Sequence, residues 1–142
     1  MLVRLLYASR AAAAVTPETI ESILAQSRAH NPALGITGIL CHGGDVFMQV
    51  LEGGRGAVNT LYNTIVRDPR HAEVALLHYE EVPERRFAGW TMGQVNLARI
   101  NPSLLLKYSE KPVLDPFAVS GRASMALLDE LMATAQIVGR IG

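Results

Sequence analysis

The order of the hydrophobic segments over the first 97 residues is the feature that most limits how this chain can fold. Two segments carry apolar residues at helical spacing, and the others are short apolar or alternating runs typical of strands. Their order is β-α-β-β-α-β followed by one further strand, which predicts an α+β, ferredoxin-like βαββαββ sheet with both helices on one face. Strands one and three are then central neighbours. The expected strands are Val3–Ser9, Gly35–Cys41, Val46–Glu52, Val74–Val82 and Trp90–Leu97.

Ordinary start and stop signals mark the ends of the two helices. Thr16-Pro17 supplies an N-cap and a proline at the first helical position, so the first helix is expected to begin there. We expect it to end near His30-Asn31-Pro32, with Asn31 interpreted as a C-terminal cap in preference to a ligand contact. The second helix is expected to stop at an ordinary turn formed by Asp68, Pro69, Arg70 and His71.

Residues 98–142 are predicted to form a helical extension of the domain. A short helix is expected over Ser103–Tyr108 and a longer amphipathic helix over about Ala118–Val138. Since one face of a ferredoxin-like sheet is otherwise bare, we expect these helices to cover it as a lid. An oligomer contact is the alternative, and a homo-oligomer is expected in that case.

The charge balance and the cysteine count exclude several classes of function. Thirteen Lys and Arg balance thirteen Asp and Glu, so neither nucleic acid nor an anionic membrane is an expected partner. The single cysteine, Cys41, excludes an internal disulfide and a multi-cysteine metal site, and it fits a reducing, cytoplasmic location. The sequence has no uncharged apolar run long enough to span a membrane. It also lacks the motifs of hydrolases and of metal sites, so neither an enzyme nor a metal centre is predicted.

Gln49 is a polar residue in an otherwise apolar strand. All residues of Val46–Leu51 except Gln49 are apolar, so both faces of the strand are apolar, which predicts a buried central strand. A buried amide without partners costs roughly 1–3 kcal/mol. The strand alone favours a structural amide over one that contacts the polar edge of a ligand. Tyr7 lies on the neighbouring strand, so its hydroxyl is expected either to bond to Gln49 or to be satisfied locally.

Taken together, five motifs resemble the BLUF family, the blue-light sensors that use flavin. The resemblance covers about residues 2–97, and the order and spacing of the motifs are those of the family. The motifs are Arg4–Ser9, His30–Leu40, Phe47–Gly53, Asp68–His71 and Arg86–Met92.

This resemblance implies a non-covalently bound FAD, with FMN or riboflavin as alternatives, whose ring lies between the two helices. It implies that Gln49 bonds both the N5/C4=O edge of the ring and Tyr7, and that Asn31 contacts the C4=O/N3 edge. His30, Arg70 and His71 are then expected near the C2=O side. The remaining residues expected at the cofactor are Ile23, Ser27, Leu40, Phe47, Ile65 and Asp68.

The resemblance also implies a photochemical mechanism. Tyr7 gives an electron and, through Gln49, a proton to the excited flavin, and Gln49 is left rotated or tautomerised. Trp90 and Met92, expected on one face of the fifth strand, would pass this change to the C-terminal helices. By pattern alone the two are core or interface residues.

The chain resembles the short members of the family, which act by binding a separate downstream protein. Residues 1–97 would be the sensor and 98–142 the output or lid. Two other functions remain open at this point: a flavin-dependent electron carrier, and a ligand-free ferredoxin-like interaction module.

Overall fold

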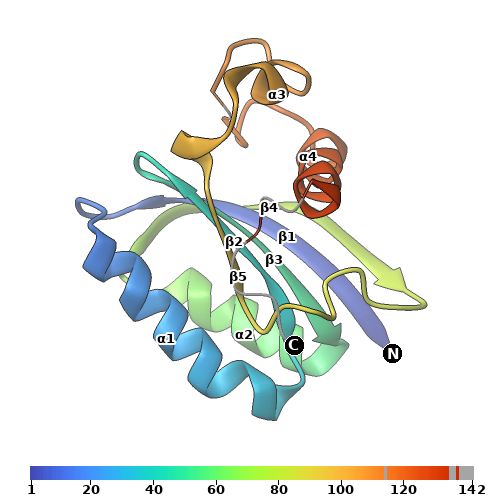
Figure 1. Ribbon diagram of the computed structural model, residues 1–142. Helices are drawn as coiled ribbons and strands as arrows, with labels where there is room; N and C mark the ends of the chain where they lie inside the picture. Colours follow the sequence, from blue (N-terminus) through green and yellow to red (C-terminus); the bar gives the residue numbers. More distant parts are fainter. Residues whose placement is uncertain (114, 135–136, 138–142) are drawn as a thin grey trace.

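A mixed sheet lies between two layers of helices. The computed structural model describes residues 1–113, 115–134 and 137. Within these residues the strand order is β4-β1-β3-β2-β5, with α1 and α2 on one face and α3 and α4 on the other (Figure 1). The strands are β1 Leu2–Ala11, β2 Thr37–Gly43, β3 Val46–Gly54, β4 His71–Val82 and β5 Gly93–Asn96. The helices are α1 Pro17–Leu34, α2 Arg55–Arg67, α3 Pro102–Leu106 and α4 Gly121–Ala133, with a 3₁₀ turn, η1, at Leu97–Arg99.

The centre of the sheet is formed by β1 and β3, as predicted. The two strands are antiparallel, and their register places Tyr7 opposite Gln49. The β4 strand pairs with the other edge of β1, and β5 is added parallel to β2. The expected α+β, ferredoxin-like arrangement is therefore confirmed. None of the helices in the described part of the chain is long and apolar enough to cross a bilayer.

The first helix runs further than predicted, and Asn31 is not its cap. Pro32 lies inside α1, and the helix ends at Leu34, with Gly35 as its C-cap at a left-handed φ of 68°. Glycine adopts this conformation without steric cost, so it is the better C-cap. The backbone C=O of Asn31 accepts the N–H of Ile36 at 3.0 Å. Its side chain is left buried, with only 2% of the residue exposed.

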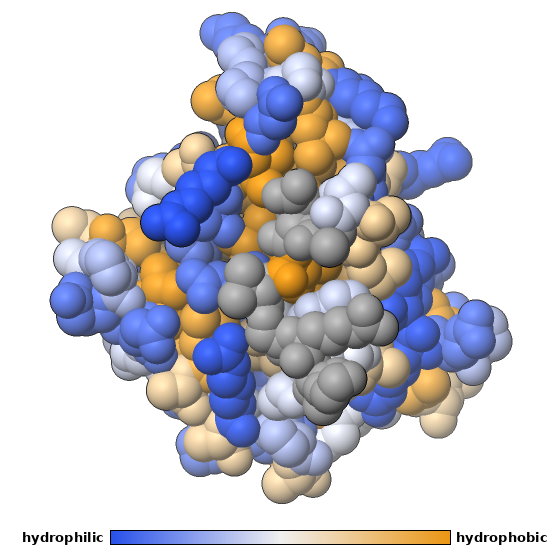
Figure 2. Space-filling view, in the orientation of Figure 1, coloured by the Kyte–Doolittle hydropathy of each residue, from blue (hydrophilic) through white to orange (hydrophobic). Residues whose placement is uncertain are grey.

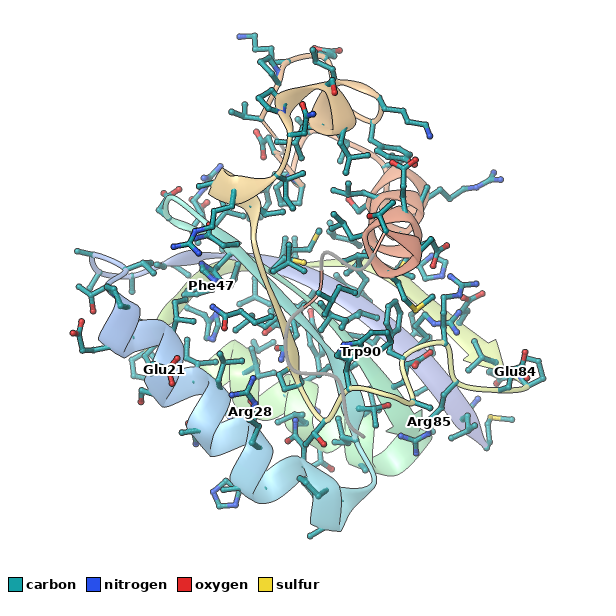
Figure 3. The ribbon with its side chains drawn as sticks, in the orientation of Figure 1. Glu21, Arg28, Phe47, Glu84, Arg85 and Trp90 are labelled. Atoms are coloured by element: carbon teal, nitrogen blue, oxygen red, sulfur yellow. The ribbon has the colours of Figure 1, made fainter. Side chains whose placement is uncertain are left out.

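The fifth strand is shorter than predicted, and this changes the positions of Trp90 and Met92. The β5 strand begins at Gly93, so neither residue belongs to it. A turn precedes it, in which the N–H of Trp90 donates to the C=O of Phe87 at 3.1 Å. Trp90, at the end of that turn, packs in the core under α4 (Figure 3), whereas Met92 packs in the core under α1 and α2. The expectation that they share one face is therefore wrong.

The C-terminal helices cover the second face of the sheet, as predicted. The α4 side chains Leu127, Leu128 and Leu131 pack in one cluster with Leu6, Ile39, Met48 and Val50 of the strands. Apolar surface gathers between α3 and α4 and the sheet in the space-filling view (Figure 2). Both helices are shorter than expected, since α3 ends at Leu106 and α4 at Ala133. The predicted end at Val138 lies outside the described residues.

A buried ion pair joins three strands to the turn before β5. Arg4 Nε donates to Glu52 Oε2 at 2.7 Å, and Arg4 Nη1 donates to Glu80 Oε1 at 2.7 Å. The Glu52 carboxylate also accepts the N–H of Arg86 at 2.9 Å and that of Phe87 at 2.6 Å. Glu52 is fully buried, and these donors satisfy both of its oxygens. The pair therefore fixes the start of the segment that carries Trp90 and Met92.

Replacing Glu52 is expected to destabilise the protein severely. Glu52→Gln keeps the side-chain volume, but it leaves the buried Arg4 guanidinium without its anion and turns an amide N–H₂ toward backbone donors. We expect the free energy of unfolding to fall by about 3–5 kcal/mol, measured by urea unfolding. The control is Glu81→Gln, which removes the exposed partner of Arg55 and should change stability little. Equal, small effects of both variants would contradict the role given to Glu52.

Candidate functional site

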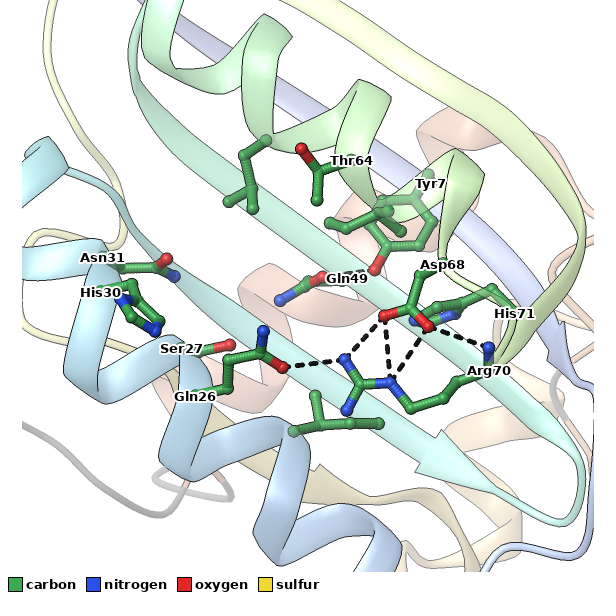
Figure 4. Close-up of a pocket in the computed structure, with 13 residues that line it drawn as sticks. Tyr7, Gln26, Ser27, His30, Asn31, Gln49, Thr64, Asp68, Arg70 and His71 are labelled. Carbon is green, nitrogen blue, oxygen red and sulfur yellow. Dashed lines mark hydrogen bonds and ion pairs between the residues drawn. The ribbon is translucent and has the colours of Figure 1, made fainter.

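A cavity of about 220 Å³ lies between α1 and α2, above β1 and β3 (Figure 4). Its floor comes from the two central strands, and its sides come from the facing surfaces of the helices and from the turn that follows α2. The residues that line it are Tyr7, Ile23, Gln26, Ser27, His30, Asn31, Gln49, Leu61, Thr64, Ile65, Asp68, Arg70 and His71.

A chain of hydrogen bonds crosses the floor of this cavity. The Tyr7 hydroxyl donates to Gln49 Oε1, and Gln49 Nε2 donates to Met92 Sδ at 3.2 Å. Tyr7 and Gln49 are both buried, at 1% and 4% exposed. Burial is the main cause that raises the pKa of the Tyr7 phenol far above its ordinary value, so the hydroxyl stays a proton donor. Gln49 therefore fits both interpretations that the sequence left open. Its amide bonds to Tyr7 and Met92 within the protein, and it also lines the cavity, where it can contact a ligand.

Asn31 brings an unused donor to the same cavity. Its Nδ2 atom is buried and has no hydrogen-bond partner in the described part of the chain. The side chain projects from α1 into the space above Gln49 (Figure 4). Such an orphaned donor costs roughly 1–3 kcal/mol unless a ligand supplies an acceptor. The donor therefore fits a ring that carries carbonyl oxygens at its edge, as a flavin does.

The two helices are linked by polar contacts on one side of the cavity. Arg70 Nη2 donates to Asp68 Oδ2 at 2.6 Å and to Gln26 Oε1 of α1 at 2.9 Å. The hydrogen bonds from Arg70 lower the pKa of the Asp68 carboxyl. His71 shares a hydrogen bond of 2.7 Å with Ser9, and burial lowers the pKa of its imidazole, so it is neutral at pH 7. A guanidinium and a neutral imidazole are thus held at one side of a cavity that both polar and apolar side chains line.

The structure brings together most of the residues that were expected at the cofactor. Two of them, Leu40 and Phe47, lie in the core under the cavity and are not among its lining residues. Sequence reasoning missed Gln26, Leu61 and Thr64 as lining residues. Helical spacing could have found them, because Gln26 lies one turn before His30 on α1, and Leu61 lies one turn before Thr64 and Ile65 on α2. No cluster of metal ligands occurs among residues 1–113, 115–134 and 137.

The buried Tyr7 phenol is expected to make stability fall at alkaline pH. Its raised pKa means that above about pH 10 the unfolded chain releases a proton that the folded protein keeps. The free energy of unfolding should then decrease by about 1 kcal/mol per pH unit through this group. Urea unfolding at about pH 8 and about pH 11 would measure the decrease in the wild type and in Tyr7→Phe. The decrease should be smaller in Tyr7→Phe, and an equal decrease would contradict the burial of an ionisable phenol.

Comparison with known proteins matches the whole site to one family. The family described as "Sensors of blue-light using FAD" matches residues 2–93, which include every residue that lines the cavity. The photoactivated adenylate cyclase subunit beta of Euglena longa is 35% identical over 92 residues, which are 64% of this chain and 11% of that protein. The chain therefore spans about a tenth of the length of this curated relative.

Two solved structures match this chain over nearly their whole length. The dark-state structure of BlrB, a BLUF protein, has a TM-score of 0.79 and 34% identity, and the match covers 94% of this chain and 96% of that one. The photo-activated state of BlsA has a TM-score of 0.80 and 28% identity, with 93% and 95% covered. With the flavin-compatible cavity, the Tyr7–Gln49 floor and the family match over residues 2–93, the chain belongs to the BLUF family of blue-light sensors that use FAD.

Proposed function

We propose that this protein signals blue light through the hydrogen-bond chain Tyr7–Gln49–Met92, with FAD bound in the cavity above it. The observation that carries this proposal is the position of that chain. It begins at a buried phenol on the cavity floor and ends at the sulfur of a residue next to β5. One end can therefore respond to a bound ring and the other end belongs to a segment that reaches the opposite face of the sheet.

The residues around the cavity have distinct roles in this proposal. When bound, the flavin supplies absorption of blue light and, in its excited state, a strong one-electron oxidant. Tyr7 is the electron donor, and its hydroxyl proton has a path to Gln49 Oε1. Asn31 Nδ2 binds an acceptor at the ring edge, and Ile23 and Ile65 exclude water from the two sides of the slot. His30, Arg70 and His71 bind polar groups further along the cofactor.

A change in Gln49 would reach the C-terminal helices through Met92. Rotation or tautomerisation of the amide replaces the Nε2 donor that now faces Met92 Sδ. Met92 is two residues from Trp90, which packs under α4 with Leu127 and Leu128. The position of α4 against the sheet is thus the output that a change at Gln49 would alter.

We further propose that the receiver is a separate signalling protein in the cytoplasm and that the BLUF domain itself catalyses no turnover. The matches to BlrB and BlsA, which cover nearly all of both chains, support a sensor of this size. The cyclase from Euglena longa, in which the matching part is a small fraction of the protein, represents the alternative arrangement of sensor and effector in one chain. Self-association through the C-terminal helices would be compatible with either arrangement.

The absorption spectrum tests the proposed function. The purified protein should be yellow in the dark, and blue light should shift the flavin bands reversibly to the red, because an altered Gln49 would donate more strongly to a carbonyl oxygen of the bound flavin. A colourless protein that takes up no added FAD would contradict flavin binding. A yellow protein that is bleached by light and an added reductant, with no red shift, would favour an electron carrier instead.

Two substitutions test the hydrogen-bond chain. Gln49→Leu removes the amide and Tyr7→Phe removes only the hydroxyl, so each should keep flavin bound and abolish the light-induced red shift. Trp90→Ala is the matched control, since Trp90 packs on the other face of the sheet. It should keep the shift and alter its recovery or the output. A complete photocycle in Gln49→Leu or Tyr7→Phe, recorded by absorption, would overturn the mechanism.

A further inference from the structure

Met92 is held at two atoms from the cavity side of the sheet. Its Sδ accepts a hydrogen bond from Gln49 Nε2, and its backbone C=O accepts one from Arg28 Nη2, each at 3.2 Å. Arg28 lies on α1, and its side chain points toward the start of β5 (Figure 3). We propose that Arg28 is a positioning residue that holds residues 90–93 in their dark arrangement. This inference rests on the proposed function, in which the bond from Gln49 to Met92 changes on illumination.

The residues before Met92 are fixed to other strands. Glu52 of β3 accepts the N–H groups of Arg86 and Phe87, and the N–H of Gly38 donates to the C=O of Trp90 at 2.9 Å. These contacts hold residues 86–90 to β2 and β3. Arg28 adds a contact to α1, so it ties the helix that borders the cavity to the segment that leads into β5.

Close packing at Gly93 couples this segment to the opposite face. A Cβ atom added to Gly93 would lie 2.6 Å from Trp90 Cδ1 and 2.7 Å from both Ile39 Cδ1 and Ile137 Cγ2. Gly93 therefore has no free space beside it on the face that α4 covers. If Met92 moved and carried Gly93 toward that face, Trp90 or Ile137 would have to move as well. Because Trp90 and Ile137 belong to the core under α4, the bond from Arg28 opposes a displacement that would reach the output helix.

Arg28 should therefore favour return to the dark arrangement. Once the Gln49 amide no longer donates to Met92 Sδ, the guanidinium is the remaining side-chain donor that the structure shows on the cavity side of Met92 among the described residues. Arg28 as a residue is exposed, but its bond is charge-assisted, and such hydrogen bonds are roughly twice as strong as those between neutral groups. Removing it should slow dark recovery and loosen β5 in the dark, whereas the residues that line the cavity stay unchanged.

The test uses three variants of the flavin-loaded protein. Arg28→Met removes the donors and keeps the length of the apolar stem, and Arg28→Lys keeps the charge and one donor group. Arg67→Met is the control, because it removes one exposed cation from α2. We expect Arg28→Met to recover about five-fold more slowly than wild type, which corresponds to about 1 kcal/mol. The recovery rate of Arg28→Lys should lie between those of Arg28→Met and wild type, and that of Arg67→Met should equal the wild-type rate.

Hydrogen exchange in the dark gives a second readout that needs no photochemistry. The amides of residues 93–96 should exchange faster in Arg28→Met than in wild type or Arg67→Met. Wild-type recovery together with wild-type exchange in Arg28→Met would overturn the proposal, as would equal slowing by Arg67→Met. If the wild type itself shows no red shift, the proposed function fails, and the dark exchange of Arg28→Met still decides whether Arg28 holds the segment.

Discussion

The register between β1 and β3 is the constraint on which the rest of the molecule depends. Tyr7 lies opposite Gln49 and Arg4 lies opposite Glu52 in one antiparallel ladder. Because side chains alternate along a strand, the first pair faces the cavity and the second faces the side of α4. A slip of β3 by one residue would turn Gln49 and Glu52 to the opposite faces, so Gln49 would leave the cavity and the buried Arg4 would lose its partner. The same pairing that builds the sheet thus places Tyr7 and Gln49 at the cavity and Glu52 at the turn before β5.

The sequence was informative where one pattern decided the outcome. The order of apolar runs predicted the sheet, and the apolar setting of Gln49 predicted a buried strand in which the amide lies beside Tyr7. Both follow from patterns that extend over many residues, so local exceptions do not change them. The grouping of His30, Asn31, Arg70 and His71 around one cavity came from the resemblance, because residues so far apart in sequence give no local sign of contact.

The errors arose where two local signals competed. At the end of α1, Asn31-Pro32 and Gly35 both resemble stops, and the ability of glycine to adopt a positive φ decided for Gly35. For Trp90 and Met92, strand alternation placed them together, but a turn held by Glu52 and Gly38 replaces the strand there. That turn depends on a carboxylate more than thirty residues earlier in the chain. No window of local sequence contains such a partner, so its effect on residue positions appears only in three dimensions.

The β5 strand lies at the edge of the sheet, away from the central strands that form the cavity floor. It has four residues and, within the described part of the chain, pairs only with β2, whereas β1 and β3 each pair on both sides. Short edge elements open at a small fraction of the free energy of global unfolding. Detaching β5 would leave β1 and β3, beneath the cavity, paired on both sides. A rearrangement confined to this edge strand would therefore leave the walls of the cofactor site intact, so it could be repeated without unfolding the domain.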